Sequence, residues 1–141
     1  MPSQTLLFIC FANTCRSPMA EAIARHLGGD RNEVFSAGLF PTGTVAPLSL
    51  QTLESLGHST AGLYSKGLDD IELEEVDVVV SLMGPDGLAG VPRRLPAERI
   101  VWSIRDPYGE DEEAYFATAR ILEQRIRQLL EELKHRGLSA L

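Results

Sequence analysis

Residues 5–17 read TLLFICFANTCRS, and this stretch decides the fold. Its first part, Thr5 to Phe11, is a near-continuous apolar run, which is typical of a central parallel strand covered on both faces. Its second part, Asn13 to Ser17, is polar and leads to Pro18, a favoured residue at the start of a helix with Ser17 as N-cap. The stretch therefore predicts a strand, a short loop and a helix, in that order.

Strand-like and helix-like segments alternate along the rest of the chain. We expect the first helix to end at Gly28-Gly29. Three further strands are expected at Glu33 to Ala37, Val76 to Leu82 and Arg99 to Ile104. Two further helices are expected at Pro47 to Leu56 and Asp111 to Lys134. The alternation predicts an α/β fold: a single domain over residues 1–141, with a doubly wound sheet of about four parallel strands and helices on both faces. Ligands of such folds bind at the carboxyl ends of the strands, where Cys10 lies.

The composition excludes several classes of protein. The chain has 141 residues, of which 44% are hydrophobic and 23% charged, as in ordinary globular proteins that bury a core. Its net charge of −7 argues against a nucleic-acid partner. The longest apolar run, Leu6 to Ala12, is much shorter than the ~20 residues of a membrane helix, and no secretory signal is evident. We therefore expect a cytoplasmic protein with no membrane partner.

Metal binding and disulfide frameworks are not expected either. The two cysteines, Cys10 and Cys15, are too few for a disulfide scaffold, and no neighbouring residues complete a zinc site. The three histidines, His26, His58 and His135, are interpreted as isolated residues.

The loop after the first strand has the pattern Cys-x5-Arg-Ser, formed by Cys10, Arg16 and Ser17. A short loop that enters a helix N-terminus points successive backbone N–H groups inward and forms an anion cradle. Such a cradle and a guanidinium group stabilise thiolate, the nucleophilic form of cysteine. Arg16 offers two coplanar donors to an oxyanion, and Ser17 can hydrogen-bond the sulfur. A buried cysteine is otherwise a small apolar side chain, but its position between strand and helix favours a nucleophile.

A second polar segment, Asp106-Pro107-Tyr108-Gly109, follows the fourth expected strand. In a parallel sheet this loop opens at the same edge as the cysteine loop. An aspartate there would protonate a leaving-group oxygen and later activate water. Taken alone, the segment is an ordinary Asp-Pro turn; beside the cysteine loop, it indicates a catalytic acid.

The chain resembles the low-molecular-weight protein tyrosine phosphatase superfamily in three motifs: Cys10 to Glu21 (CFANTCRSPMAE), Ser36-Ala37-Gly38 and Asp106-Pro107-Tyr108-Gly109. That superfamily includes thioredoxin-coupled arsenate reductases and bacterial protein-arginine phosphatases. The resemblance spans nearly the whole chain and implies a phosphotyrosine phosphatase I-like fold. It implies that Cys10 forms a phosphocysteine, that Arg16 binds the phosphoryl oxygens, and that Asp106 is the general acid and then the base.

The resemblance also implies a phosphate-binding loop that needs no metal or other cofactor. Its residues would be Phe11, Ala12, Asn13, Thr14, Cys15, Arg16 and Ser17. Relatives usually have glycine at the position of Ala12, so we expect local strain there, because alanine disfavours positive φ. We expect Tyr108 and Phe40 as aromatic pocket walls and Cys10 and Cys15 as a redox pair that can form a protective disulfide.

The expected partners are a phosphorylated protein or a small phosphomonoester, with phosphate, sulfate or arsenate as anions that fit the loop. Ser65-Lys66 and Trp102 resemble the arsenate reductases, but Met83 stands where their first resolving cysteine is expected. Thr14 resembles the arginine phosphatases. We expect a phosphotyrosine phosphatase; arsenate reductase and protein-arginine phosphatase stay open as alternatives. A non-enzymatic anion sensor is disfavoured, because it would not need Asp106.

Overall fold

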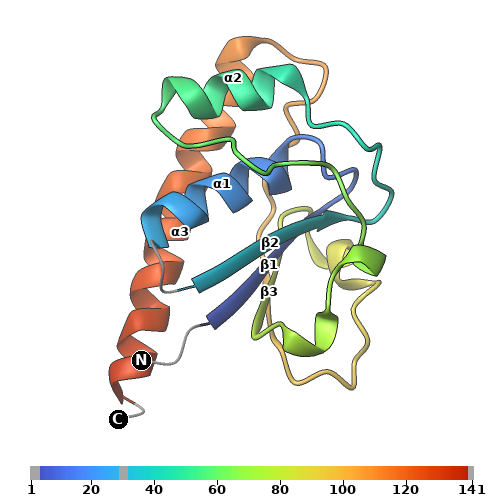
Figure 1. The fold of residues 1–141 in the computed structure, drawn as a ribbon, viewed down its shortest axis with the longest axis vertical. Coiled ribbons are helices and arrows are strands. Elements are labelled where there is room, and N and C mark those ends of the chain that lie inside the picture. Colours follow the sequence, from blue (N-terminus) through green and yellow to red (C-terminus); the bar gives the residue numbers. More distant parts are fainter. Residues whose placement is uncertain (1–3, 29–31, 140–141) are drawn as a thin grey trace.

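The computed structural model describes residues 4–28 and 32–139. Within them, four parallel strands form one sheet in the order β2-β1-β3-β4. The strands are β1 (Gln4–Cys10), β2 (Asn32–Gly38), β3 (Val78–Ser81) and β4 (Glu98–Val101), and the α-helices are α1 (Arg16–Gly28), α2 (Pro47–Ser55) and α3 (Glu112–Ser139). The expected α/β fold with about four parallel strands is confirmed (Figure 1).

Strand β1 lies at the centre of the sheet because both of its faces are apolar. Leu6 and Phe8 point into one apolar cluster, while Leu7 and Ile9 point into the other, and none of the four is exposed to solvent. Side chains of a strand alternate between its faces, so the continuous apolar run fills both layers.

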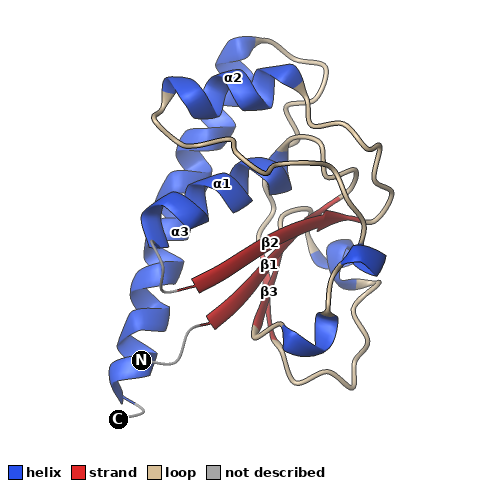
Figure 2. Ribbon diagram, in the orientation of Figure 1, coloured by secondary structure: helices blue, strands red, loops and turns tan. Residues whose placement is uncertain are grey.

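The two faces of the sheet are covered in different ways (Figure 2). The α-helices pack on the Leu6–Phe8 face, where Met19, Ile23, Leu53, Leu122 and Ile126 are fully buried. The other face is covered by three short 3₁₀ helices, η2 (Leu68–Asp70), η3 (Leu73–Glu75) and η4 (Pro85–Leu88). Gly84, Pro85 and Gly87 lie at or next to η4, where they favour a single turn over a longer helix.

Some boundaries differ from those expected. Helix α1 begins at Arg16, because the Met19 N–H donates to the Cys15 carbonyl and closes the first turn there (3.2 Å). Ser17 therefore lies inside that turn and not at the N-cap. Gly29, the second residue of the expected helix end, lies outside the described residues.

The strand order reverses direction at β1, which has β2 on one side and β3 on the other. In doubly wound sheets such a reversal opens a crevice at the carboxyl ends of the strands. The loops that follow β1 and β4 both begin at this edge, so the fold brings the two segments expected to carry chemistry together. No helix in the described part of the chain is long and apolar enough to cross a membrane.

Candidate active site

The carbonyl groups of the loop between β1 and α1 point away from the centre of the loop. The carbonyls of Cys10, Phe11 and Thr14 accept hydrogen bonds from the backbone N–H groups of Leu39, Phe40 and Ala46, at 3.2, 2.8 and 3.0 Å. Within residues 4–28 and 32–139, none of the backbone N–H groups of residues 11–17 donates to a protein acceptor. A row of free N–H groups at a helix N-terminus is a binding site for an anion.

Asn13 gives the loop its shape. Its φ of 53° lies in the left-handed region, which asparagine tolerates better than most residues. Its Nδ2 donates to Ser17 Oγ (2.7 Å) and to Ser36 Oγ (2.9 Å), and its Oδ1 accepts from the Lys66 N–H (2.8 Å). The expectation of strain at Ala12 is wrong: the positive φ belongs to the neighbouring Asn13, so alanine fits at position 12.

Cys10 lies at the base of this loop. Its sulfur is 2.9 Å from Ser17 Oγ, and the side chain is buried. Arg16 is also buried and donates from Nη1 to the Ile104 carbonyl (3.0 Å), which fixes the guanidinium at the carboxyl edge of the sheet. In the described part of the chain, the buried Nε of Arg16 has no hydrogen-bond partner. Leaving a buried donor unpaired is costly, so an oxyanion beside Cys10 would stabilise the site.

Asp106 approaches from the loop after β4. One carboxylate oxygen is 3.5 Å from Nη2 of Arg16, and the other accepts a hydrogen bond from the Tyr108 N–H at 3.1 Å. The side chain of Asp106 is 46% exposed, so it lies at the mouth of the site and in reach of water. Cys10 and Arg16 from the loop after β1 and Asp106 from the loop after β4 thus lie together.

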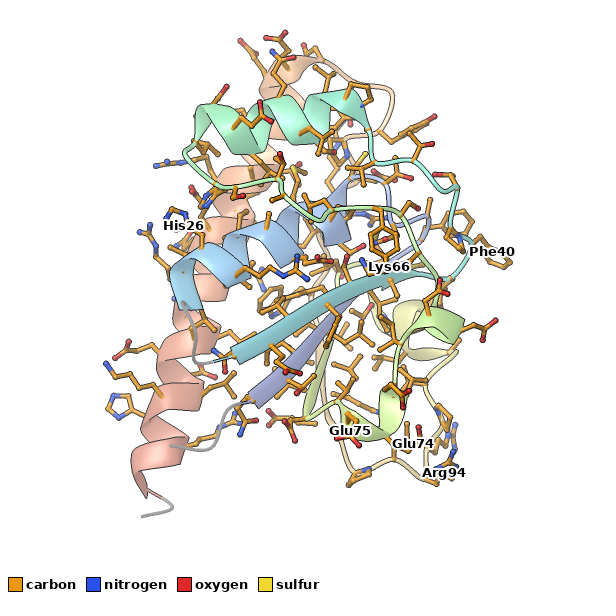
Figure 3. All side chains as sticks on the ribbon, viewed as in Figure 1. His26, Phe40, Lys66, Glu74, Glu75 and Arg94 are labelled. Atoms are coloured by element: carbon orange, nitrogen blue, oxygen red, sulfur yellow. The ribbon has the colours of Figure 1, made fainter. Side chains whose placement is uncertain are left out.

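A cavity of about 280 Å³ lies over the loop, and its lining comprises Cys10, Phe11, Ala12, Thr14, Cys15, Arg16, Thr42, Asp106 and Tyr108. Phe40, expected as a second aromatic wall, does not line it: this side chain points outward and packs on Phe11, with the ring centroids 5.3 Å apart (Figure 3). Phe11, and not Phe40, forms the second aromatic wall of the cavity beside Tyr108. Asn13 and Ser17 are fully buried behind the loop and do not reach the cavity.

Cys15 has a different environment from Cys10. Burial raises the pKa of the Cys15 thiol, and hydrogen bonds from Tyr115 and Ser49 offset this only in part. The Tyr115 hydroxyl lies 3.4 Å from the Cys15 sulfur. Both cysteines are free thiols in this structure.

Three polar features were not expected from the sequence. Thr42 lines the cavity, with its Oγ1 3.0 Å from Thr14 Oγ1. Glu21 is fully buried on α1; the sequence signal for this was a single charge within an apolar run.

The third unexpected feature corrects the interpretation of the histidines as isolated. His58 is buried, with Nε2 2.7 Å from Glu123 Oε2 and Nδ1 2.7 Å from His26 Nδ1. These contacts join segments far apart in the sequence, so spacing could not reveal them. The described residues contain no group of three or more His, Cys, Asp or Glu side chains placed to hold a metal ion.

Comparison with known proteins agrees with this geometry. Residues 5–88 match the family model of the low molecular weight phosphotyrosine protein phosphatases. The match covers more than half of the chain, so the protein belongs to this family and is an enzyme of the family.

Similar proteins carry different names within that family. A glutaredoxin arsenate reductase of Synechocystis sp. is 30% identical over 134 residues, which are 91% of this chain and 97% of the relative. The YwlE arginine phosphatase from Geobacillus stearothermophilus superposes with a TM-score of 0.85 at 27% identity and covers 96% of each chain. A low molecular weight protein tyrosine phosphatase from T. tengcongensis has a TM-score of 0.81 at 27% identity, over 92% of this chain and 99% of its own.

Proposed function

We propose that this protein hydrolyses phosphomonoesters through a phosphocysteine intermediate, with phosphotyrosine in proteins as the substrate class. The observation that carries the proposal lies beside the Cys10 sulfur: among the described residues, neither the N–H groups of residues 11–17 nor the Nε of Arg16 has a protein acceptor. Together they supply donors for the equatorial oxygens of a phosphoryl group and a nucleophile below it.

In the first step, the Cys10 thiolate attacks phosphorus and the bond from phosphorus to the ester oxygen breaks. Protonated Asp106 gives its proton to the departing oxygen, so the alcohol or phenol leaves neutral. Arg16 and the loop N–H groups hold the charge on the three remaining oxygens as the S–P bond forms.

In the second step, water attacks the phosphocysteine. Asp106, now a carboxylate, accepts a proton from that water, and the S–P bond breaks to release inorganic phosphate and the thiolate. The partly exposed position of Asp106 at the cavity mouth suits both transfers, because the leaving group and the water enter from that side.

The substrate class is supported by the walls of the cavity. Phe11 and Tyr108 line it and are 49% and 68% exposed, so both rings are available to pack on a flat substrate. Aromatic rings pack favourably on one another, which favours a phosphorylated phenol over a phosphorylated aliphatic alcohol.

Arsenate reduction is a second candidate, because the similar Synechocystis protein is named an arsenate reductase and arsenate is a tetrahedral oxyanion like phosphate. Reduction of arsenate to arsenite takes two electrons, which two thiols provide when they form a disulfide. This chain has Cys10 and Cys15 only, so a full cycle would need an external thiol to restore them.

Phosphoarginine is a third candidate. The structurally similar Geobacillus enzyme is named an arginine phosphatase, and the Thr14 hydroxyl faces Thr42 at the cavity wall. A hydroxyl at that position can accept a hydrogen bond from an N–H next to phosphorus, which a phenyl ester lacks.

Hydrolysis of p-nitrophenyl phosphate in the presence of chelator and reductant tests the proposal, with Cys10→Ser as the control. We expect turnover in the wild type and none in the variant. Phosphotyrosine and phosphoarginine peptides, and arsenate with glutathione, are then compared at equal concentration. Faster release of phosphate from the phosphoarginine peptide would overturn the substrate class, and arsenite formation without ester hydrolysis would overturn the reaction.

A further inference from the structure

The acid and the nucleophile of the proposed reaction are held in the structure in different ways. Cys10 and Arg16 are buried, whereas Asp106 belongs to a surface loop, residues 105–110, in which only Pro107 is buried. A segment with few buried contacts is among the least stable parts of a fold. The position of the Asp106 carboxyl therefore depends on the few contacts that this loop makes.

An ion pair joins the two ends of the loop. Arg105 Nη2 lies 2.6 Å from Glu110 Oε1, and the Glu110 N–H donates to the Pro107 carbonyl at 2.9 Å. Each end is next to a fixed part of the fold, because the buried Ile104 precedes Arg105 and helix α3 begins two residues after Glu110. The ion pair therefore fixes the distance between the two ends of the segment that contains Asp106.

The contact between Asp106 and Arg16 does not fix the acid during the first step of the proposed reaction. Its length of 3.5 Å exceeds the ~3.2 Å upper end of a normal N–H···O hydrogen bond. Asp106 must also be protonated to donate, and a neutral carboxyl loses its charge attraction to the guanidinium. The Tyr108 N–H binds a carboxyl oxygen at 3.1 Å, but it belongs to the same loop. The position of the neutral carboxyl is therefore set by the position of the loop.

We propose that Arg105 and Glu110 are positioning residues whose ion pair holds the loop of residues 105–110 so that Asp106 can protonate the leaving oxygen. Neither side chain lines the cavity, so both act through Asp106. The inference rests on the proposed function, because it needs Asp106 as the general acid. Exposed ion pairs contribute little to stability, so we expect almost no effect on folding and a distinct effect on one chemical step.

The opposite charges of the two partners separate positioning from electrostatics. Arg105→Gln makes the surroundings of the cavity more negative, and Glu110→Gln makes them more positive. A direct effect of charge on an anionic substrate would therefore have opposite signs in the two variants. Loss of the ion pair is common to both variants, so it must change activity in the same direction.

The test compares two substrates that differ in their need for an acid. Phenol is a poor leaving group unless it is protonated, whereas 2,4-dinitrophenolate is stable as an anion and leaves without a proton. The measured quantity is kcat/KM for phenyl phosphate divided by kcat/KM for 2,4-dinitrophenyl phosphate. In both Arg105→Gln and Glu110→Gln we expect this ratio to fall about threefold, the size of effect of one exposed ion pair. An unchanged ratio in either variant, or opposite changes in the two, overturns the proposal.

A double-mutant cycle tests whether the two residues act through their mutual contact. The protein with both substitutions has lost the same single contact as either variant alone, so its ratio should fall about threefold and not about ninefold. A fall equal to the product of the two single effects would show that Arg105 and Glu110 act independently, and the ion pair would then not be the cause.

Arg94 and Glu74 provide a matched control. They form another exposed Arg–Glu pair outside the cavity, with Arg94 Nη2 3.1 Å from Glu74 Oε1 (Figure 3). Arg94→Gln removes the same charge as Arg105→Gln and should leave the ratio of the two substrates unchanged. If the ratio fell equally in Arg94→Gln, the effect would not depend on the Asp106 loop, and the proposal would be wrong.

Failure of the inference and failure of the proposed function give different results. Hydrolysis of 2,4-dinitrophenyl phosphate needs no acid, so its dependence on Cys10 in the wild type reports on the proposed function alone. If that hydrolysis is absent, amide hydrogen exchange of the Glu110 N–H, measured by NMR, still tests the loop. We expect faster exchange in Arg105→Gln than in the wild type and in Arg94→Gln. Equal exchange in the three proteins would contradict a role of the ion pair in holding the loop.

Discussion

At the level of single residues, the two cysteines have different hydrogen-bond partners although only five positions separate them: Ser17 lies beside Cys10 and Tyr115 beside Cys15. Burial raises the pKa of Cys15, so at a given pH a smaller fraction of it is thiolate, the form that reacts with alkylating agents. We therefore expect iodoacetamide at pH 7 to modify Cys10 and to leave Cys15 unmodified, with inorganic phosphate protecting Cys10. Peptide mass spectrometry measures both sites at once. Equal modification of Cys15 would contradict the assignment of Cys10 as the reactive thiol.

The Arg16 guanidinium has hydrogen-bond donors that point in two directions, which a simple positive charge does not provide. Its Nη1 donates to the Ile104 carbonyl, while its buried Nε has no partner among the described residues. A lysine ammonium cannot reach both, so Arg16→Lys should lower kcat/KM for p-nitrophenyl phosphate by about 10²–10³, the usual effect of losing one such oxyanion donor. Arg94→Lys is the control, because Arg94 is exposed and pairs with Glu74 outside the cavity. Equal activity of the two variants would exclude a special role for Arg16.

At the level of elements, the end of β2 supports the cysteine loop at very short range. A Cβ on Gly38 would lie 2.6 Å from the Asn13 backbone nitrogen, which no real structure allows, so either the loop or the strand would have to shift. We expect Gly38→Ala to reduce turnover at least tenfold and to destabilise the protein by about 1–3 kcal/mol, as overpacking does. Steady-state kinetics and urea unfolding provide the two readouts.

The control for this change is Gly28→Ala. A Cβ there would lie 3.3 Å from the Asn32 Nδ2, a side-chain atom that can move aside. That variant should keep its turnover. If Gly38→Ala also kept it, the close packing of β2 against the loop would not matter for catalysis.

Some elements and contacts of the fold can be predicted from the sequence, and others cannot. The strand at the start of the chain and the long C-terminal helix follow from local apolar spacing, and the positions of Cys10 and Asp106 follow from where their strands end. By contrast, Lys66 and Glu21 are 45 residues apart, and nothing in their local sequence indicates that they meet. The 3₁₀ helix η4 was not predicted either, because a single turn within a segment rich in glycine and proline has no period to detect.

At the scale of the whole molecule, one polar centre lies at each end of α1. Arg16 begins the helix at the cavity, and His26 lies ten residues later, about 15 Å along the axis, where it meets His58. His58 in turn contacts Glu123, so this second centre joins α1, the segment after α2, and α3. We infer that the first centre is used for chemistry and the second for holding the helices together.

Replacing His58 by leucine separates the two roles. Among the described residues it leaves the Glu123 carboxylate with Arg120 alone, at 3.3 Å, and it removes the contact to His26, so we expect the free energy of unfolding to fall by about 1–3 kcal/mol. Because Cys10, Arg16 and Asp106 keep their surroundings, kcat/KM well below the melting temperature should match the wild type. His135→Leu is the matched control, since His135 is 75% exposed and should change neither quantity. A fall in kcat/KM of His58→Leu at full folding would show that the helices and the site are coupled through α1, and the division into two independent centres would then be wrong.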